Sequence, residues 1–295
     1  MNYNCPNLNC SSYQKPDFVI KDGFFFRKND SRKVQRFRCK KCGSRFCSQT
    51  HKLEYYQKKR RINFPLFKLI CSGVSMRRAA IILNINKTTI ERRIPYMGQK
   101  YRKKNQILLK NKKITQKLQF DDLITKENSK LKPLSVSIAV DKETRFILGA
   151  KVSQIPSFGH LSKVAKNKYG KRKCHHKQGL KALFEQIKVF VDPNSLIESD
   201  EHQNYPEFVK RYFPRSEFIQ HKSERAHIAG LGELKKVSFD PLFTINHTSA
   251  MFRDNLNRLV RRTWCTTKKV QALQDQLDMF IYYHNHYYLK RLTPI

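Results

Sequence analysis

Four cysteines near the start of the chain have the spacing of a metal site. Four residues separate Cys5 from Cys10, and two separate Cys39 from Cys42. Thiolates at such spacings can face one ion, and two such pairs complete a tetrahedral zinc site. The alternatives are scattered structural thiols or a disulfide pair, and disulfides are disfavoured in an intracellular chain. We therefore predict a structural Zn²⁺ ion at Cys5, Cys10, Cys39 and Cys42, with Cys47 as a less well spaced substitute.

Acidic residues lie on two predicted strands in the second half of the chain. Residues 118–124 read as a short strand containing Asp121 and Asp122, and residues 196–200 read as a strand that ends on Asp200. Neighbouring strand ends can bring such carboxylates together around metal ions. Taken alone, Asp121 and Asp122 fit a turn or a helix N-cap equally well. His175 and His176 have no second pair of ligands nearby, and we predict that they lie at the surface.

The elements around these acids indicate an α/β domain. Strict alternation over residues 134–140 and again over 145–152 predicts two more strands after the first. The remaining pattern predicts helices over 179–191 and 205–212, a strand over 217–219, and helices over 247–264 and 268–288. Three strands, a helix and a further strand, with acids on the first and fourth strands, follow the order of an RNase H-like fold.

The first half predicts two small modules and a linker. Residues 1–50 contain short apolar runs around the cysteines, as in the antiparallel strands of a zinc ribbon. Residues 51–100 read as a helix-turn-helix, in which Ser75 caps the second helix and the third begins at Lys87. An ordinary pair of packed helices is the alternative. Residues 101–117 are predicted to be a basic linker, and residues 118–295 the α/β domain.

The charge of the chain indicates a polyanionic partner. Its 295 residues include 60 Lys and Arg against 23 Asp and Glu, a formal net charge of +37. The first 118 residues carry 30 of these basic residues and only 5 of the acids. Such a surface suits nucleic acid. The sequence shows neither a bilayer-spanning apolar run nor a signal peptide, so we expect a soluble intracellular protein without a membrane partner.

Over nearly its full length the chain resembles a bacterial insertion-sequence transposase of the IS-one type. The ribbon matches through its four cysteines, and the helix-turn-helix through Gly73–Ser75, Ala79–Ala80 and Thr88–Ile90. The catalytic half matches through three further stretches: Asp121–Asp122, Ser199–Asp200, and the basic series from Arg253 through Arg258 and Leu259 to Thr263. In the classical family the ribbon and the nuclease come from two overlapping frames, whereas here they lie in one chain.

The resemblance implies a DDE-type transposase that cleaves the ends of its own element and joins them to target DNA. It implies catalytic Mg²⁺ or Mn²⁺ held by Asp121 and Asp200, with Asp122 where the family commonly has Glu. It also implies an oligomer of the chain on paired inverted repeats of double-stranded DNA, in the bacterial cytoplasm at the nucleoid. The polar side of the predicted third helix offers Lys87, Thr88, Arg92 and Arg93 to the DNA. The further expected contacts, to backbone phosphates, are Arg253, Arg258, Arg261, Arg262, Lys268 and Lys269.

The third catalytic position departs from the family pattern, because Asn246 stands where the family has Glu. An amide oxygen can ligate Mg²⁺, as an Asn does in protein kinases. Alternatively, Asn246 caps a helix that begins near His247, and Glu233 supplies the third ligand; Asp240 and Asp254 are weaker candidates. Two other functions stay open: a DNA-binding protein with a catalytically dead transposase domain, and a basic RNA-binding zinc protein.

Overall fold

The chain forms two compact units, Met1–Pro65 and Leu66–Ile295. The computed structural model describes residues 3–13, 15, 17–28, 31–52, 54–55, 57–222, 240–261 and 264–292. These units differ from the predicted division at residues 50, 100 and 117. The boundary falls inside the predicted helix-turn-helix, so that residues 66–100 belong to the second unit, and no separate linker follows them.

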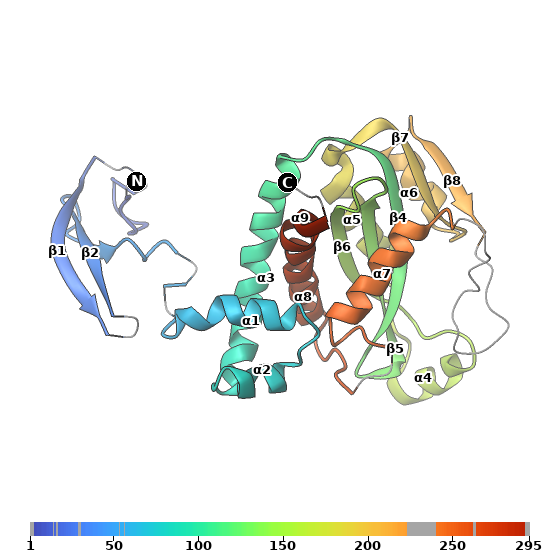
Figure 1. Cartoon of the computed structure of the whole chain (residues 1–295), viewed down its shortest axis with the longest axis horizontal. Helices are drawn as coiled ribbons and strands as arrows, with labels where there is room; N and C mark the ends of the chain where they lie inside the picture. Colours follow the sequence, from blue (N-terminus) through green and yellow to red (C-terminus); the bar gives the residue numbers. More distant parts are fainter. Residues whose placement is uncertain are drawn as a thin grey trace. The chain divides into compact units, whose positions relative to one another are not determined.

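The first unit is built on a small antiparallel sheet. Its described strands are β1 (Val19–Arg27), β2 (Arg32–Cys39) and β3 (Arg45–Cys47), in the order β1-β2-β3 (Figure 1). A short 3-10 helix, η1 (Arg60–Ile62), follows. The buried rings of Phe37 and Phe46 lie 5.7 Å apart and form much of the apolar interior. So small a core contributes little stability by itself.

Three helices open the second unit. They are α1 (Asn63–Ile70), which begins just before the boundary, α2 (Met76–Ile82) and α3 (Lys87–Lys110). The Ser75 side chain accepts a hydrogen bond from the backbone N of Arg78 and caps α2, as predicted. Ala79 is fully buried, which permits close approach of a neighbouring helix. Because α3 continues to Lys110 and a strand starts at Thr115, most of the predicted linker is helix.

A five-stranded mixed sheet forms the centre of this unit. Its described strands lie in the order β6-β5-β4-β7-β8. Adjacent strands are antiparallel from β6 to β4, whereas β4, β7 and β8 run parallel. The bounds are β4 (Thr115–Glu127), β5 (Ser129–Asp141), β6 (Ile147–Gln154), β7 (Val191–Asp200) and β8 (Glu217–His221).

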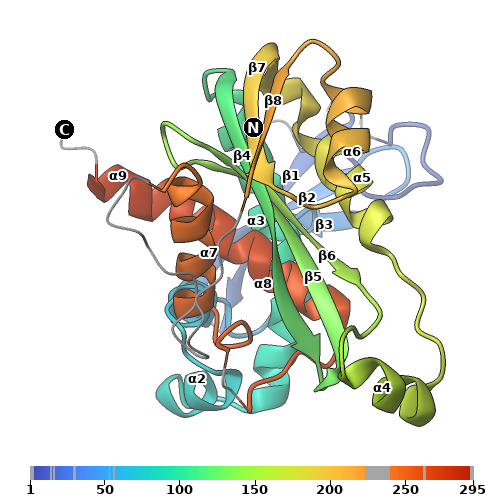
Figure 2. The ribbon, with the colours of Figure 1, turned by 90° about the vertical axis from the view of Figure 1, so that its right-hand side faces the viewer.

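Helices cover both faces of the sheet. Figure 2 shows α5 (His176–Ile187) and α6 (Tyr205–Tyr212) on one face, and α7 (Phe243–Asn255) and α8 (Val270–Tyr283) on the other. The α5 face packs around Phe120 and Phe184, whereas the α7 face packs around Leu123 and Phe252. The remaining elements are α4 (Leu161–Tyr169), which the sequence analysis did not predict, η2 (Lys188–Phe190), the π-helical turn η3 (His284–Tyr288) and α9 (Leu289–Leu292).

The long helix α3 packs against α8 rather than standing free. Gly98 leaves no room for a side chain, because a Cβ there would lie 2.5 Å from the Cβ of Asp275. One turn further on, the Arg102 guanidinium donates to Asp278 at 2.8 Å and to Asp275 at 3.4 Å. The predicted helix-turn-helix is thereby joined to the α/β part of the chain. None of the described helices is long and apolar enough to cross a bilayer.

Candidate functional site

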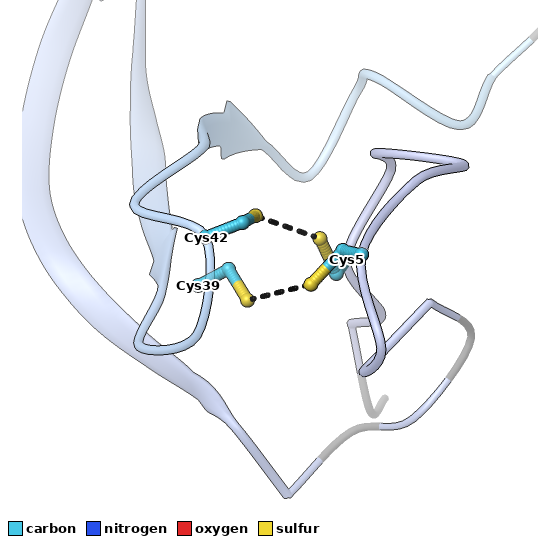
Figure 3. A group of neighbouring side chains, drawn as sticks. Cys5, Cys39 and Cys42 are labelled. Atoms are coloured by element: carbon cyan, nitrogen blue, oxygen red, sulfur yellow. Dashed lines mark hydrogen bonds between the residues drawn. The ribbon is translucent and has the colours of Figure 1, made fainter.

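The four predicted zinc ligands come together in the first unit. The Sγ atoms of Cys5, Cys10, Cys39 and Cys42 all lie within 4.8 Å of one another. Figure 3 shows Cys39 and Cys42 on one loop facing Cys5, and the Cys5–Cys42 sulfur distance is 3.5 Å. The Cys10–Cys39 sulfur distance is 3.9 Å. This arrangement is compatible with a structural zinc site.

Local geometry explains why these thiols converge. Gly43 adopts φ = +70° directly after Cys42, and its backbone N donates to Cys39 O at 2.9 Å, so the glycine makes a tight turn there. A hydrogen bond with the Ser44 hydroxyl lowers the pKa of Cys42 to about 6. Burial raises the pKa of Cys5 to about 12, which a bound cation would reverse by stabilising the thiolate. The predicted substitute, Cys47, is not a member of this cluster.

In the second unit, Asp121 lies in the middle of β4, and Asp200 is the last residue of the neighbouring strand β7. The paired register of the two parallel strands ends at Gln119 and Glu198. Asp121 and Asp200 therefore each lie two residues beyond the last pair. Because side chains alternate along a strand, each aspartate shares a face with Gln119 or Glu198, which are hydrogen-bonded to each other at 3.1 Å. The structure thus places the two predicted catalytic aspartates on one face.

Glu198 is a buried acid that the sequence analysis did not single out. Its carboxylate accepts hydrogen bonds from Lys142 at 2.9 Å and from Gln119, and contacts His221 Nε2 at 3.1 Å. Burial alone would raise the pKa of Glu198, but the hydrogen bonds from Lys142 and Gln119 lower it. Its oxygens are thus engaged by protein donors, which suits a structural role below the two aspartates.

The first turn of α7 is attached to this face. The Gln119 side chain accepts from Ile245 N at 3.1 Å and donates to Pro241 O at 2.7 Å. Asn246 lies in this turn, is partly exposed, and donates to Asp240 at 3.0 Å. Since α7 begins at Phe243, Asn246 is not the N-cap that the alternative required. A chain of contacts thus leads from Gln119 of β4 to the turn that carries Asn246.

The other acids considered for the third position fall elsewhere. Glu233 lies outside the described residues. Asp254 is exposed at the far end of α7, where its backbone O lies near Gly73. Asp122 points to the opposite face of β4 from Asp121, because it contacts His176 of α5. Among the described candidates for the third ligand, Asn246 and its hydrogen-bond partner Asp240 lie at the start of α7.

His176 is buried, so the prediction that it lies at the surface is wrong. It is the first residue of α5 and precedes Leu180, Leu183 and Phe184 by four, seven and eight positions. Residues at these spacings share one helix face. The signal was thus present in the sequence: His176 heads the apolar stripe that faces the sheet, whereas His175 does not.

The predicted DNA-contacting residues lie in three parts of the chain: the start of α3, residues 253–262, and residues 268–269. Lys87, Thr88 and Arg92 are exposed, whereas Arg93 is buried, contrary to the prediction. Arg93 follows Ile90 by three positions and adjoins Ile94, and therefore falls on the packed side of α3. Arg262 lies outside the described residues. The exposed members elsewhere are Arg261, Lys268 and Lys269, and Arg253 and Arg258 are partly exposed.

The structure brings two of these groups together. The hydrogen bond and charge of Lys87 lower the pKa of Glu91 on α3, and the charges of Lys268 and Arg258 lower it further. The start of α3 and the segment after α7 therefore contribute to one basic surface, although more than 160 positions separate them in sequence. Arg253 and Arg261 line a pocket together with Lys126 and Lys130.

Comparison with protein-family models finds none that matches the chain, and comparison with curated proteins finds no match.

Proposed function

We propose that this chain is a DDE-type DNA transposase with an N-terminal zinc ribbon, a helix-turn-helix and an RNase H-like catalytic core. One observation carries the proposal: Asp121 and Asp200 share a sheet face beyond the last β4–β7 pair, beside the helix turn that carries Asn246. The strand order β6-β5-β4-β7-β8, antiparallel and then parallel, supports the RNase H-like assignment. Four zinc-compatible cysteines support the ribbon.

The donor set suits the proposed chemistry. Two carboxylates and an amide offer only oxygen atoms, the ligands that Mg²⁺ and Mn²⁺ prefer. Two such ions would activate the attacking oxygen and stabilise the leaving oxygen in phosphodiester transfer. Contacts within the chain position these residues. Hydrogen bonds of the Gln119 side chain link β4 to Glu198 of β7 and to the start of α7, and Lys142 forms an ion pair with Glu198.

The basic surface supports DNA as the substrate. Lys87, Arg258 and Lys268 all lie near Glu91. A duplex bound at α3 would therefore meet cations from two segments of the second unit that are far apart in sequence. Such residues hold backbone phosphates and give binding that weakens steeply with salt. Arg93 is not part of this surface, and we assign it to packing.

End-specific cleavage tests the function directly. Purified chain with Mg²⁺ or Mn²⁺ is expected to nick linear DNA at the inverted repeats that flank its own gene, and to join the ends to a supercoiled plasmid. The measurement is strand-resolved gel analysis, with DNA carrying scrambled ends as the control. Tight binding to the repeats with no cleavage in either ion would instead support a DNA-binding protein with an inactive domain. Preference for structured RNA in competition would support the RNA-binding alternative.

Asn246 is expected to act as the third metal ligand. Replacing Asn246 with Ala should lower the rate of strand cleavage at least about a hundredfold, because even partners outside the ligand shell are worth ten- to hundredfold. Asn246→Glu, which supplies the family's carboxylate, should retain much more activity than Asn246→Ala. Single-turnover cleavage, with folding and DNA binding checked, measures the effect.

Asp254→Asn is the matched control, because Asp254 lies on the same helix but at its exposed far end. It should cleave like the wild type. The assignment is wrong if Asn246→Ala cleaves normally while Glu233→Ala is inactive.

A further inference from the structure

A second cluster of potential metal ligands lies on the other face of β4. Ligand atoms of Asp122, His176 and His202 all lie within 4.8 Å of one another. They come from three elements: Asp122 from β4, His176 from the first position of α5, and His202 from the segment between β7 and α6. The cluster is therefore assembled by the tertiary fold from residues up to 80 positions apart.

Hydrogen bonds hold each ligand in place. The Asp122 carboxylate contacts Ser137 Oγ and His176 Nε2, and the Asp122 and His176 side chains are 9% and 7% exposed. The Asn204 side chain contacts the other ring nitrogen of His176 at 3.3 Å, and Asn204 N donates to His202 Nδ1 at 3.2 Å. A ring nitrogen that ligates a metal carries no proton, so the other ring nitrogen must then carry it, and the two Asn204 contacts would rearrange when an ion binds.

A buried hydroxyl lies beside the cluster. Tyr205 is fully buried, and within the described part of the chain its Oη makes no hydrogen bond of normal geometry, although the Asp122 carboxylate lies near it. Its ring stacks on His202 at a centroid distance of 4.7 Å. A buried polar group without a partner calls for an ion or a water molecule nearby.

The donor set discriminates between metals. Two imidazoles and one carboxylate suit Zn²⁺, whereas Mg²⁺ prefers oxygen ligands alone. With zinc–ligand distances of about 2.0–2.2 Å, tetrahedral ligand atoms lie about 3.4 Å apart, so the Asp122–His176 contact would widen when an ion enters between the two side chains. His202 is only partly buried, which leaves a path for an ion to enter.

We infer that Asp122, His176 and His202 bind one Zn²⁺ ion, with a water molecule in the fourth position. This site is separate from the cysteine cluster and lies on the face of β4 opposite Asp121. An ion there would link β4, α5 and the start of α6, and would hold the strand that carries Asp121. The inference concerns metal binding and does not depend on transposase activity.

Zinc content measures the site in the full chain. After loading with Zn²⁺ and desalting in millimolar Mg²⁺, wild type is expected to retain about two zinc ions, one at each cluster. His202→Ala and His176→Ala should each retain about one, and His175→Ala, the matched neighbour outside the cluster, should retain two. The chain carrying both Asp121→Ala and Asp200→Ala should also keep two, which separates this site from the proposed catalytic ions.

Thermal unfolding gives a second readout. Added Zn²⁺ should raise the melting temperature of the second unit in wild type and in His175→Ala, but not in His202→Ala, because an ion that binds only the folded state stabilises it. His202→Ala decides the matter if His176→Ala does not fold, since His202 is the least buried ligand.

Three results would overturn the inference. Wild type could retain a single zinc ion that Cys39→Ser removes. The second ion could persist in His202→Ala. The variant that carries both Asp121→Ala and Asp200→Ala could lose the second zinc ion, which would assign that ion to the face of β4 that carries Asp121.

Discussion

Replacing Asp121 or Asp200 with Asn is expected to reduce DNA strand cleavage by at least about 10³-fold, equivalent to about 4 kcal/mol of transition-state stabilisation. Each substitution removes one negative charge from the face on which the metal ions would bind, and leaves the side-chain volume almost unchanged. Binding to the DNA ends should persist, because the basic residues near α3 are untouched. Single-turnover cleavage and a binding titration measure the two effects separately.

Asp192→Asn provides the matched control for this experiment. Asp192 lies on the same strand as Asp200 but at its opposite end, where it contacts Gln116 at 3.0 Å and caps a turn at Asn194. The variant should cleave like the wild type. Normal cleavage by either Asp121→Asn or Asp200→Asn would refute the catalytic assignment, and a parallel loss of DNA binding would indicate a structural role instead.

Removal of zinc is expected to unfold the first unit while the second stays folded. A structural zinc ion supplies folding free energy of about 10 kcal/mol or more, which the small interior around Phe37 and Phe46 cannot replace. The second unit has two large apolar clusters of its own. Hydrogen exchange read by mass spectrometry, with and without a chelator, should therefore show loss of protection over roughly residues 1–50.

Cys39→Ser should reproduce the effect of the chelator, and Cys47→Ser should not. Cys47 is buried like Cys39 and lies in the same sheet, but its thiol contacts Thr50 at 3.6 Å and is not part of the sulfur cluster. The pair therefore separates loss of a ligand from loss of a buried thiol. A zinc-free preparation in which Cys39→Ser remains folded would contradict the prediction.

Locally determined features were predictable from the residues themselves. The spacing of the cysteines, the turn at Gly43 and the cap at Ser75 each depend on contacts within a few positions of the chain. Alternation over residues 134–140 likewise places a strand that the structure confirms as part of β5. These features follow from backbone geometry and short-range hydrogen bonds, which the sequence alone determines.

Boundaries were less predictable, because packing competes with local preference. The basic residues after Tyr101 indicate an exposed linker, yet Arg102 pairs with Asp278 and Gly98 fits against α8, so α3 continues to Lys110. The helix predicted over 247–264 instead spans Phe243–Asn255. Its first turn begins earlier because Gln119, on a distant strand, accepts from Ile245 N.

The candidate sites divide in the same way. The sequence by itself identified Asp121 and Asp200 as acids on strands, but only the fold decided that Asp121 and Asp122 face opposite sides of β4. That single alternation assigns Asp121 to the face of α7 and Asp122 to His176, which lies 54 positions further along the chain. The periods of helices and strands are local properties of the sequence. Which side chains each face of a strand contacts depends on the helices that cover that face, and this is determined by packing of the whole core.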